Sequence, residues 1–386
     1  MINHTSNLAL YLHIPYCRTR CSYCDFNAHA LPSETTGLFE RYAEALIKDI
    51  KNQKKAEVST IFWGGGTPSL MPLEPLSEIV RALDERFTWS AELENTIEAN
   101  PGQISAETFE QYLKLGINRL SIGAQSFHSS HLELVGRVHS PKDIQTTYET
   151  ARSVGFSNIS LDLIYGFPQQ SLDQWKETLQ KALELNPNHF SIYQLTIEPS
   201  TRLEVQLAKG ELELPPEDDM IAMDDWAEKT LTEAGYSRYE VSNWCKPGCE
   251  SQHNQAYWSD RSYLGLGCGA VSFLNGWRFE RIKAPAYYER ALAQGRSPVI
   301  FAEKRSADGA LKDHLMMGLR VKNGVSVNVL EGRYPGFKRE ELEAFFERLP
   351  SAWWRRREDS FELTRRGWDF HSEVTIELMN VMFSFS

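Results

Sequence analysis

The chain lacks long hydrophobic runs, an excess of basic residues and a leader-like start. Its net charge is -11, because 52 Asp and Glu outnumber 41 Lys and Arg, so it has no overall positive charge with which to neutralise nucleic-acid phosphates. No run approaches the roughly 18 apolar residues of a membrane span, and residues 1–7 carry no basic region of the kind that begins a secretory signal. These absences favour a cytoplasmic protein without a nucleic-acid partner or a transmembrane segment, whose function depends on a pocket.

Cysteine is also scarce, yet three of the six cysteines lie within eight residues. Cys17, Cys21 and Cys24 have the spacing C-x3-C-x2-C and follow an apolar segment, 8–14, that we expect to be a strand. Thiolates select iron–sulfur clusters, zinc or copper(I). A closed zinc site or a fully ligated [4Fe-4S] cluster takes four protein ligands, so three cysteines leave one metal position open for a substrate or a cofactor. The alternative is a zinc site whose fourth ligand is His13, Asp25 or His29.

Short apolar runs alternate with amphipathic stretches from residue 8 to about residue 200, which is the pattern of βα units around a parallel sheet. Six strands are expected, at 8–14, 60–63, 96–99, 119–122, 158–164 and 190–195. Five helices are expected between them, at 38–53, 76–87, 106–115, 141–154 and 172–185. Right-handed βα crossovers curl such units into an open partial (β/α)6 barrel of the TIM type or arrange them as a doubly wound sheet. The expected fold class is α/β, with the partial barrel first.

The alternation stops after Pro199 and an acidic stretch with two prolines, 211–219. We therefore expect a partial barrel over 1–210 and a linker helix with an extension over 211–300. The residues 301–386 suggest a smaller α+β, winged-helix-like domain. Its basic and acidic residues nearly balance, which disfavours DNA binding.

Polar and glycine residues follow several expected strands directly. They are the turn Gly64-Gly65-Gly66-Thr67-Pro68, Glu98, Gln125 and Asp162. The carboxyl ends of parallel strands meet at one edge, where α/β proteins place their sites. Each feature is weak evidence alone, because three glycines also make an ordinary tight turn and a carboxylate at a strand end is more often solvated than functional. Together they predict one shared site.

The three-cysteine motif, Tyr23 between its last two cysteines and the glycine-rich turn together resemble the radical S-adenosylmethionine (SAM) superfamily. The resemblance implies a [4Fe-4S] cluster held by Cys17, Cys21 and Cys24. It also implies that the amino and carboxylate groups of SAM chelate the fourth iron, and that one electron cleaves SAM to a 5'-deoxyadenosyl radical.

Four segments narrow the resemblance to the branch that contains oxygen-independent coproporphyrinogen III oxidase and the haem chaperone HemW. They are 11–17, 62–69, 123–127 and 161–168. By position, the resemblance assigns Tyr11, Gly65 and Glu98 to the cluster-bound SAM, with Tyr23 beside them. It matches further residues to a second SAM of the oxidase, namely Gly66, Thr67, Gln125, Arg137, Asp162 and Thr196. An ordinary ion pair between Arg137 and Asp162 is the alternative.

Two features favour the HemW group within this branch. The oxidase has a further cysteine two residues after the third, where this chain has Phe26. Residues 253–258, His-Asn-Gln-Ala-Tyr-Trp, resemble the H-N-x-x-Y-W motif that is associated with haem binding in HemW. Imidazole is a common axial ligand of haem, and aromatic rings stack on its macrocycle. Without the resemblance, His253 is better interpreted as a hydrogen-bonded core histidine, with Tyr257 and Trp258 as a core pair.

Three motifs remain outside this site. Cys245, Cys249 and Cys268 form no second cluster motif and are interpreted as free thiols, with Cys245 or Cys249 as an alternative haem ligand. Residues 353–357, Trp-Trp-Arg-Arg-Arg, are better interpreted as a solvated face with two anchoring aromatics than as a docking surface. The spacing in 265–270 does not fit a dinucleotide-binding turn.

Two functions therefore stay open. The resemblance implies a cytoplasmic [4Fe-4S], SAM-binding haem chaperone that receives an electron from a donor and passes haem to acceptor proteins, including membrane-bound ones. This interpretation assigns no catalytic residue. The alternative is an enzyme that converts coproporphyrinogen III to protoporphyrinogen IX with SAM. A zinc-bound structural protein is disfavoured by six βα units that share one face.

Overall fold

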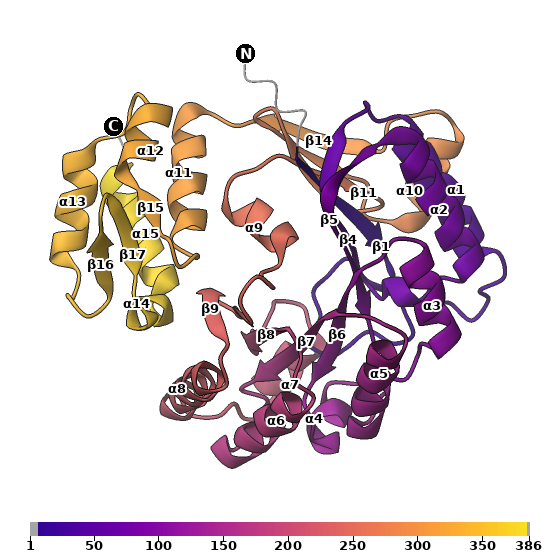
Figure 1. Cartoon of the computed structure of the whole chain (residues 1–386), viewed down its shortest axis with the longest axis horizontal. Helices are drawn as coiled ribbons and strands as arrows, with labels where there is room; N and C mark the ends of the chain where they lie inside the picture. Colours follow the sequence, from indigo (N-terminus) through magenta and orange to yellow (C-terminus); the bar gives the residue numbers. More distant parts are fainter. Residues whose placement is uncertain (1–6, 384–386) are drawn as a thin grey trace.

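The computed structural model describes residues 7–383 and has two parts, drawn in Figure 1. A 12-stranded sheet with helices around it forms the larger part, and a smaller unit with a three-stranded sheet lies at the left of the view. Residues 1–6, which belong to the segment used to predict the absence of a secretory signal, lie outside the described residues. The strand order of the large sheet is β14-β13-β12-β11-β1-β4-β5-β6-β7-β8-β10-β9.

Six parallel strands form the centre of the large sheet. They are β1 (Leu8–Ile14), β4 (Glu57–Gly65), β5 (Thr88–Ala99), β6 (Arg119–Gln125), β7 (Asn158–Tyr165) and β8 (His189–Gln194). Each pairs in parallel with the next in the chain. A doubly wound sheet reverses its strand order at a switch point, and these six strands show no reversal. The prediction of a partial barrel is confirmed.

The helices between these strands cover the outer face of the curved sheet (Figure 1). They are α1 (Leu38–Lys51), α2 (Leu73–Arg86), α3 (Ala106–Lys114), α5 (Pro141–Ser153) and α6 (Leu172–Glu184), with the shorter η1 (Pro68–Leu70), α4 (Ser129–Leu134) and α7 (Arg202–Ala208). The starts of α5 and α6 are fixed by capping boxes, in which Ser140 and Ser171 exchange bonds with the third helical residue. The expected helices therefore lie close to their predicted bounds.

Strands beyond the six extend the sheet at both edges, and the sequence patterns did not predict them. They are β11 (Tyr263–Leu266), β12 (Val271–Leu274), β13 (Trp277–Arg281) and β14 (Val299–Lys304) at one edge, and β10 (Asn243–Cys245) and β9 (Ser237–Glu240) at the other. β11 pairs in parallel with β1. It is hard to recognise from sequence because it is short and contains Gly265, whose missing side chain leaves room for the carbonyl oxygen of Val271. The helices α8 (Glu217–Glu233) and α10 (Pro285–Ala293) accompany these strands.

The C-terminal unit has its own hydrophobic core. Its elements are α11 (Ala307–Gly318), β15 (Val325–Ser326), α12 (Val327–Arg333), α13 (Arg339–Arg348), β16 (Trp354–Arg357), β17 (Ser360–Leu363), α14 (Arg365–Asp369) and α15 (His371–Met382). Trp353 stacks on Phe370 with 4.3 Å between ring centroids, and Trp354 packs against Phe346. Arg355, like the two arginines after it, is exposed. The structure thus agrees with anchored aromatics beside a solvated basic stretch.

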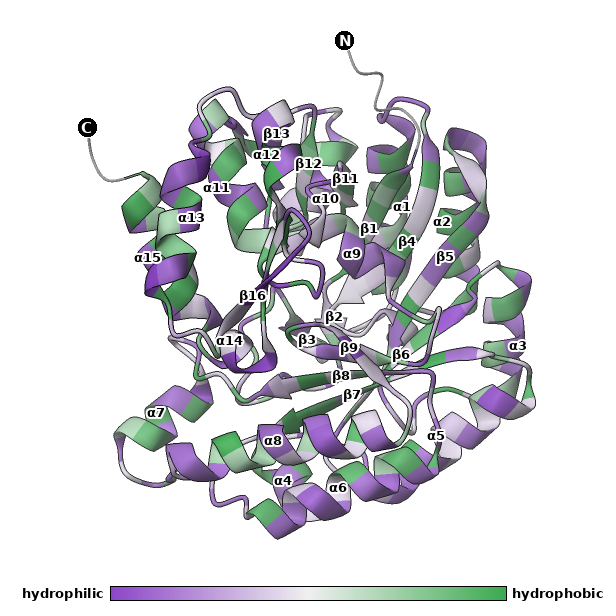
Figure 2. Cartoon of the chain, turned by 60° about the vertical axis from the view of Figure 1, so that its left-hand side comes forward, coloured by the Kyte–Doolittle hydropathy of each residue, from purple (hydrophilic) through white to green (hydrophobic). Residues whose placement is uncertain are grey.

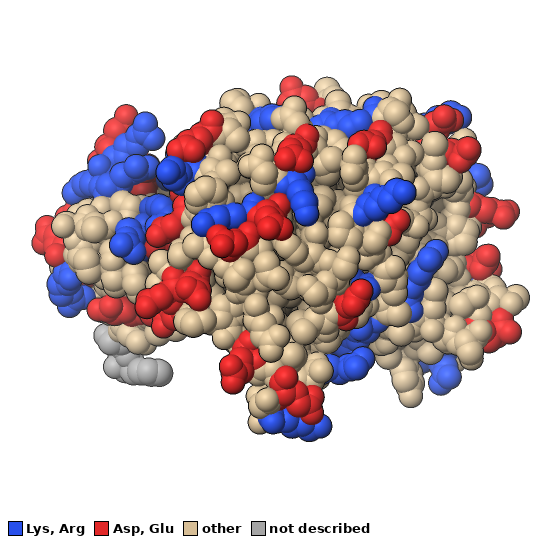
Figure 3. Space-filling model, turned by 90° about the horizontal axis from the view of Figure 1, so that it is seen from below, with Lys and Arg blue, Asp and Glu red and all other residues tan. Residues whose placement is uncertain are grey.

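The outer surface is mixed in character. Figure 2 shows hydrophobic residues along central strands such as β7, whereas the surrounding helices alternate hydrophobic and hydrophilic positions. On the face in Figure 3, Lys and Arg are interspersed with Asp and Glu. Within residues 7–383, no helix combines the length and the apolar character needed to cross a membrane.

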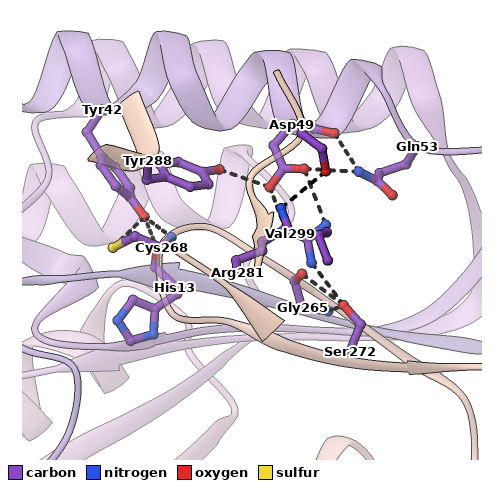
Figure 4. Close-up of polar contacts among 11 residues, drawn as sticks. His13, Tyr42, Asp49, Gln53, Gly265, Cys268, Ser272, Arg281, Tyr288 and Val299 are labelled. Atoms are coloured by element: carbon purple, nitrogen blue, oxygen red, sulfur yellow. Dashed lines mark hydrogen bonds and ion pairs between the residues drawn. The ribbon is translucent and has the colours of Figure 1, made fainter. Parts of the chain in front are cut away.

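A buried ion pair fastens the sheet extension to the first helix (Figure 4). Asp49 of α1 accepts hydrogen bonds from Nε of Arg281 at 2.7 Å and from the hydroxyl of Tyr288 at 3.0 Å. The side chains of Asp49 and Arg281 are only 2% and 4% exposed. Since 232 residues separate the two partners, this contact holds β13 and α10 against the start of the barrel.

We predict that Asp49→Ala destabilises the protein by about 3–5 kcal/mol, because it leaves the Arg281 guanidinium buried without its partner. Urea unfolding followed by circular dichroism measures the change. Lys338→Ala, which removes an exposed ion pair with Glu341, is the control and should change stability by less than about 1 kcal/mol. Equal effects of the two substitutions would contradict this account of the sheet extension.

Candidate functional site

A cavity of about 490 Å³ lies at the carboxyl ends of the parallel strands. Twelve of the fourteen residues that the sequence assigned to cofactors and metal line it. They are Cys17, Cys21, Tyr23, Cys24, Gly65, Gly66, Thr67, Glu98, Gln125, Arg137, Asp162 and Thr196. Tyr11 and His253 are not in its wall. Residues from four separate strands therefore line one cavity, as their predicted positions at the strand ends imply.

The cysteine loop is tied to the barrel at both ends. It begins in β2 (Tyr16–Cys17), which pairs in parallel with β3 (His29–Ala30). Within the loop, the backbone N–H of Ser22 donates to the carbonyl of Val135, and the carbonyl of Ser22 accepts from Leu203. These bonds fix the loop across the mouth of the cavity, so the three thiols face one space.

The thiols suit a cluster better than a single ion. Among residues 7–383, no three His, Cys, Asp or Glu side chains converge closely enough for one metal ion. A cluster does not need such convergence, because each cysteine binds a different iron. The zinc alternative also loses His13, whose Nε2 is engaged by the carbonyl of Asn27 at 2.9 Å. Burial raises the pKa of the Cys17 and Cys24 thiols, so a bound cationic group must supply the free energy that keeps them as thiolates.

The glycine-rich turn is shaped by its packing against the start of the cysteine loop. Gly65 has φ of 111°, and a β-carbon there would lie 2.6 Å from the ring of His13. A β-carbon on Gly66 would lie 2.8 Å from the backbone of Tyr16. Only glycine fits at both positions, and the N–H of Gly65 donates to Oε2 of Glu98 at 3.2 Å.

Two carboxyl groups, Glu98 and Asp162, line the cavity, and the charge of Asp162 acts on Glu98. Burial and, secondarily, the nearby Asp162 raise the pKa of Glu98 to about 8, although Gly65 and Arg137 oppose the shift. Burial also raises the pKa of Asp162, which accepts hydrogen bonds from Ser121 at 2.9 and 3.0 Å. Like charges that share a poorly solvated site resist joint ionisation. The cavity is therefore prepared for a cationic ligand.

Arg137 does not form the ion pair with Asp162 that the sequence left open. Its guanidinium donates to Oδ1 of Asn100 at 2.5 Å and to the hydroxyl of Tyr23 at 3.1 Å. Asn100 donates in turn to Oγ1 of Thr67, at 2.9 Å. Thr67 then donates to the sulfur of Cys17 at 3.4 Å. A continuous set of hydrogen bonds thus connects Arg137 with Cys17 of the cysteine loop.

Asn100 and several other wall residues were missed by the sequence analysis. Further examples are Phe62, Arg119, Ser121, Ser191, Tyr193 and Asn254. Asn100 lies two residues after Glu98 and before a proline, so the strand-end rule that selected Glu98 also applied to it. Arg119 begins β6 rather than ending it and is 2% exposed. No strand-end signal marks such a residue.

Tyr11 and His253 lie behind the cavity wall. The Tyr11 hydroxyl bonds Nδ1 of His13 at 3.0 Å, and its ring lies 6.3 Å from that of Phe62. His253, in α9 (Gln252–Trp258), bonds Oγ1 of Thr60 through Nδ1 at 2.8 Å and the Tyr257 hydroxyl through Nε2 at 2.9 Å. Burial lowers the pKa of His253 to about 3. It is thus a neutral histidine with both ring nitrogens engaged.

We predict that Glu98 makes the cluster-free protein less stable as pH rises. Its raised pKa means that the folded state holds a proton that the unfolded state has lost, so stability declines between about pH 4.5 and pH 8. Glu98→Gln should remove a decline on the order of 4–5 kcal/mol, since one pKa unit corresponds to about 1.4 kcal/mol. Urea unfolding at pH 5 and pH 8.5 measures it. Glu92→Gln, at an exposed position of the same strand, should keep the wild-type slope; an unchanged slope in Glu98→Gln would contradict the assignment.

Comparisons with known proteins agree with this geometry. The sequence model of the radical SAM superfamily matches residues 11–182. The heme chaperone HemW of Bacillus subtilis strain 168 is 36% identical over 84% of this chain and 86% of its own length, and that of Escherichia coli K12 is 40% identical over 75% and 76%. The structure of the coproporphyrinogen III oxidase HemN from Escherichia coli superposes with a TM-score of 0.85, at 22% identity, over 98% of this chain and 91% of that one. The HemN likeness shows a shared fold, and the HemW relatives show that this chain belongs to the HemW family of radical SAM proteins.

Proposed function

We propose that the protein is a haem chaperone, which holds a [4Fe-4S] cluster and SAM and transfers haem to acceptor proteins. The observation that carries the proposal is Phe26, which stands where the oxidase has its additional cysteine. Phe26 is 66% exposed on the rim of the cavity, so no buried packing role accounts for it. The HemW relatives, which are named as heme chaperones, support the same function.

The cavity residues divide into two groups in this proposal. Cys17, Cys21 and Cys24 hold the cluster, and Gly65 and Glu98 contact the SAM that completes it, with Tyr11 and Tyr23 supporting this end. The remaining assigned residues form the wall available to further SAM atoms, namely Gly66, Thr67, Gln125, Arg137, Asp162 and Thr196. Gln125 has φ of 63°, a strained conformation for a residue other than glycine that is typical of ligand sites.

Bound cluster and SAM supply one-electron chemistry, whereas the chain supplies charge and orientation. SAM carries a cationic sulfonium, and a nearby positive charge favours the ionised form of a carboxyl group. SAM binding is therefore expected to lower the pKa of Glu98 and to release a proton near neutral pH. The bond between Glu98 and the Gly65 N–H holds the carboxylate in place for this contact.

The oxidase remains the second candidate because the polar wall of the cavity is intact. Anaerobic reconstitution with iron and sulfide, followed by parallel assays on one preparation, separates the two. A chaperone binds haem and produces no protoporphyrinogen IX from coproporphyrinogen III. Turnover of coproporphyrinogen III with stoichiometric release of methionine would establish the oxidase instead.

The same proposal places the protein in the cytoplasm. All six cysteines are free in the structure, and a reducing compartment preserves such thiols. The partners are haem, an electron donor for the cluster and haem-acceptor proteins, including membrane-bound ones.

We predict that Cys24→Ser abolishes cluster assembly, because the remaining two cysteines cannot hold three of the four irons. Iron and sulfide analysis after anaerobic purification should show the loss of most of both. Cys249→Ser is the matched control, since Cys249 lies outside the cavity wall, and it should retain wild-type iron. Stoichiometric zinc in the wild-type protein, without sulfide, would refute the cluster assignment.

A further inference from the structure

A second cavity, of about 780 Å³, lies between the barrel and the C-terminal unit. Its walls come from β9, β10 and α9 on the barrel side and from α11, α12 and residues 321–326 on the other. Figure 1 shows α9 between the sheet and the C-terminal unit. The volume falls within the roughly 300–1,000 Å³ of small-molecule and cofactor sites. No function described above uses this space.

The frame of this second cavity is held by specific contacts across the interface. The backbone N–H of Val241 donates to the carbonyl of Arg320 at 3.0 Å, and that of Lys322 donates to the carbonyl of Tyr239 at 3.0 Å. Asp260 forms ion pairs with arginines of both flanking segments, Arg305 at 2.5 Å and Arg333 at 2.6 Å. The side chain of Asp260 is only 6% exposed, so these ion pairs are shielded from water and hold the two sides of the cavity together.

His314 of α11 is presented to this cavity in the manner of a metal ligand. Its Nδ1 bonds the Tyr334 hydroxyl at 3.1 Å, and the two rings meet edge to face at 87°. Among the contacts of residues 7–383, its Nε2 has no hydrogen-bond partner. Ligating histidines are commonly held through their second nitrogen in this way.

His253 lacks these properties. Both of its ring nitrogens are engaged, by Thr60 and Tyr257, and it lines neither cavity. The residue is 1% exposed, and its ring stacks on Phe62 with 5.2 Å between centroids. Ligation by His253 requires the loss of at least one of these hydrogen bonds and an opening of α9, whereas ligation by His314 requires neither.

The other walls suit a flat, apolar ring that carries carboxylates. The indole of Trp258 lines the cavity, and its buried Nε1–H has no acceptor in the described part of the chain. Lys322 is an exposed lining residue, as is Arg333, which is paired with Asp260. Val321 and Val329 provide apolar surface, and Glu250 is the one carboxylate among these lining residues. The ammonium of Lys322 can pair with a propionate of haem, and the indole of Trp258 can pack against its macrocycle.

We propose that haem occupies this cavity between the barrel and the C-terminal unit, with Nε2 of His314 as its axial ligand. The proposal rests on the haem-chaperone function above and names the site of the cargo. His253 then has a positioning role: it holds α9 so that Trp258 forms part of the cavity wall. The first cavity is left to the cluster and SAM.

Haem titration of the cluster-loaded full chain, followed by optical and electron paramagnetic resonance spectroscopy, tests the proposal. His314→Gln preserves a polar partner for Tyr334 but removes the ligand. It should weaken haem binding at least about tenfold, the lower end of the loss when the support of a metal ligand is removed, and should change the ligand-field signature. His371→Gln, in the same unit but outside the cavity, should bind as the wild type does. His314→Ala should regain the histidine-type spectrum when free imidazole is added.

The failures are distinguishable. If the wild-type protein binds no haem, the chaperone function is wrong. If it binds haem and His314→Gln keeps the wild-type affinity and spectrum, only the cavity assignment is wrong. A histidine-type spectrum in His314→Gln that disappears in His253→Gln would assign the ligand to His253. Thermal unfolding of each variant identifies misfolding, and imidazole rescue of a folded His314→Ala supports the proposal independently.

Discussion

The position of His13 is the constraint on which the site depends. Its Nε2 engages the carbonyl of Asn27 just after the three cysteines, and its Nδ1 engages Tyr11. Its carbonyl accepts from Tyr42, while Gly65 and Gly267 pack so closely that β-carbons on them would lie 2.6 Å from its ring and its carbonyl oxygen. Desolvation lowers the pKa of His13 and keeps the ring neutral. Because Gly65 packs against the side chain of His13 and Gly267 against its backbone carbonyl, the end of the cysteine loop is held in place without a bound metal.

The backbone around the first cavity is held in place by the protein itself, whereas the ionisable groups in its wall have no cationic ligand beside them until one binds. Glu98 and Asp162 have raised pKa values for the same reason as Cys17 and Cys24: the cavity removes water without supplying a cation. Arg137 compensates Glu98 only in part, because its guanidinium donates its hydrogen bonds to Tyr23 and Asn100. Burial of these groups away from water lowers the stability of the ligand-free protein. Binding of a cationic ligand offsets this cost, so the preorganised site binds such a ligand more tightly.

Local sequence signals predicted what depends on local structure. The six strands and the helices between them follow from periodicity and capping, and the strand-end rule placed Glu98, Gln125 and Asp162 in one cavity. What the sequence did not reveal arises from contacts between distant segments. The partners Asp49 and Arg281 are 232 residues apart, and β11 is recognisable only through its pairing with β1. The second cavity has the same origin, since its walls come from the barrel side and the C-terminal unit, which are far apart in the sequence.

The short helix α9 connects the two cavities and changes how the H-N-x-x-Y-W motif is understood. Asn254 lines the first cavity and Trp258 the second, only four residues later. Glu94 accepts the N–H groups of Gln252 and His253, and the bond from His253 to Thr60 ties the helix to β4, whose end carries Gly65. A haem-binding defect after substitution of His253 is therefore no proof of ligation, because the same change releases Trp258. Only a readout of the iron's own coordination separates a ligand from a residue that positions the wall.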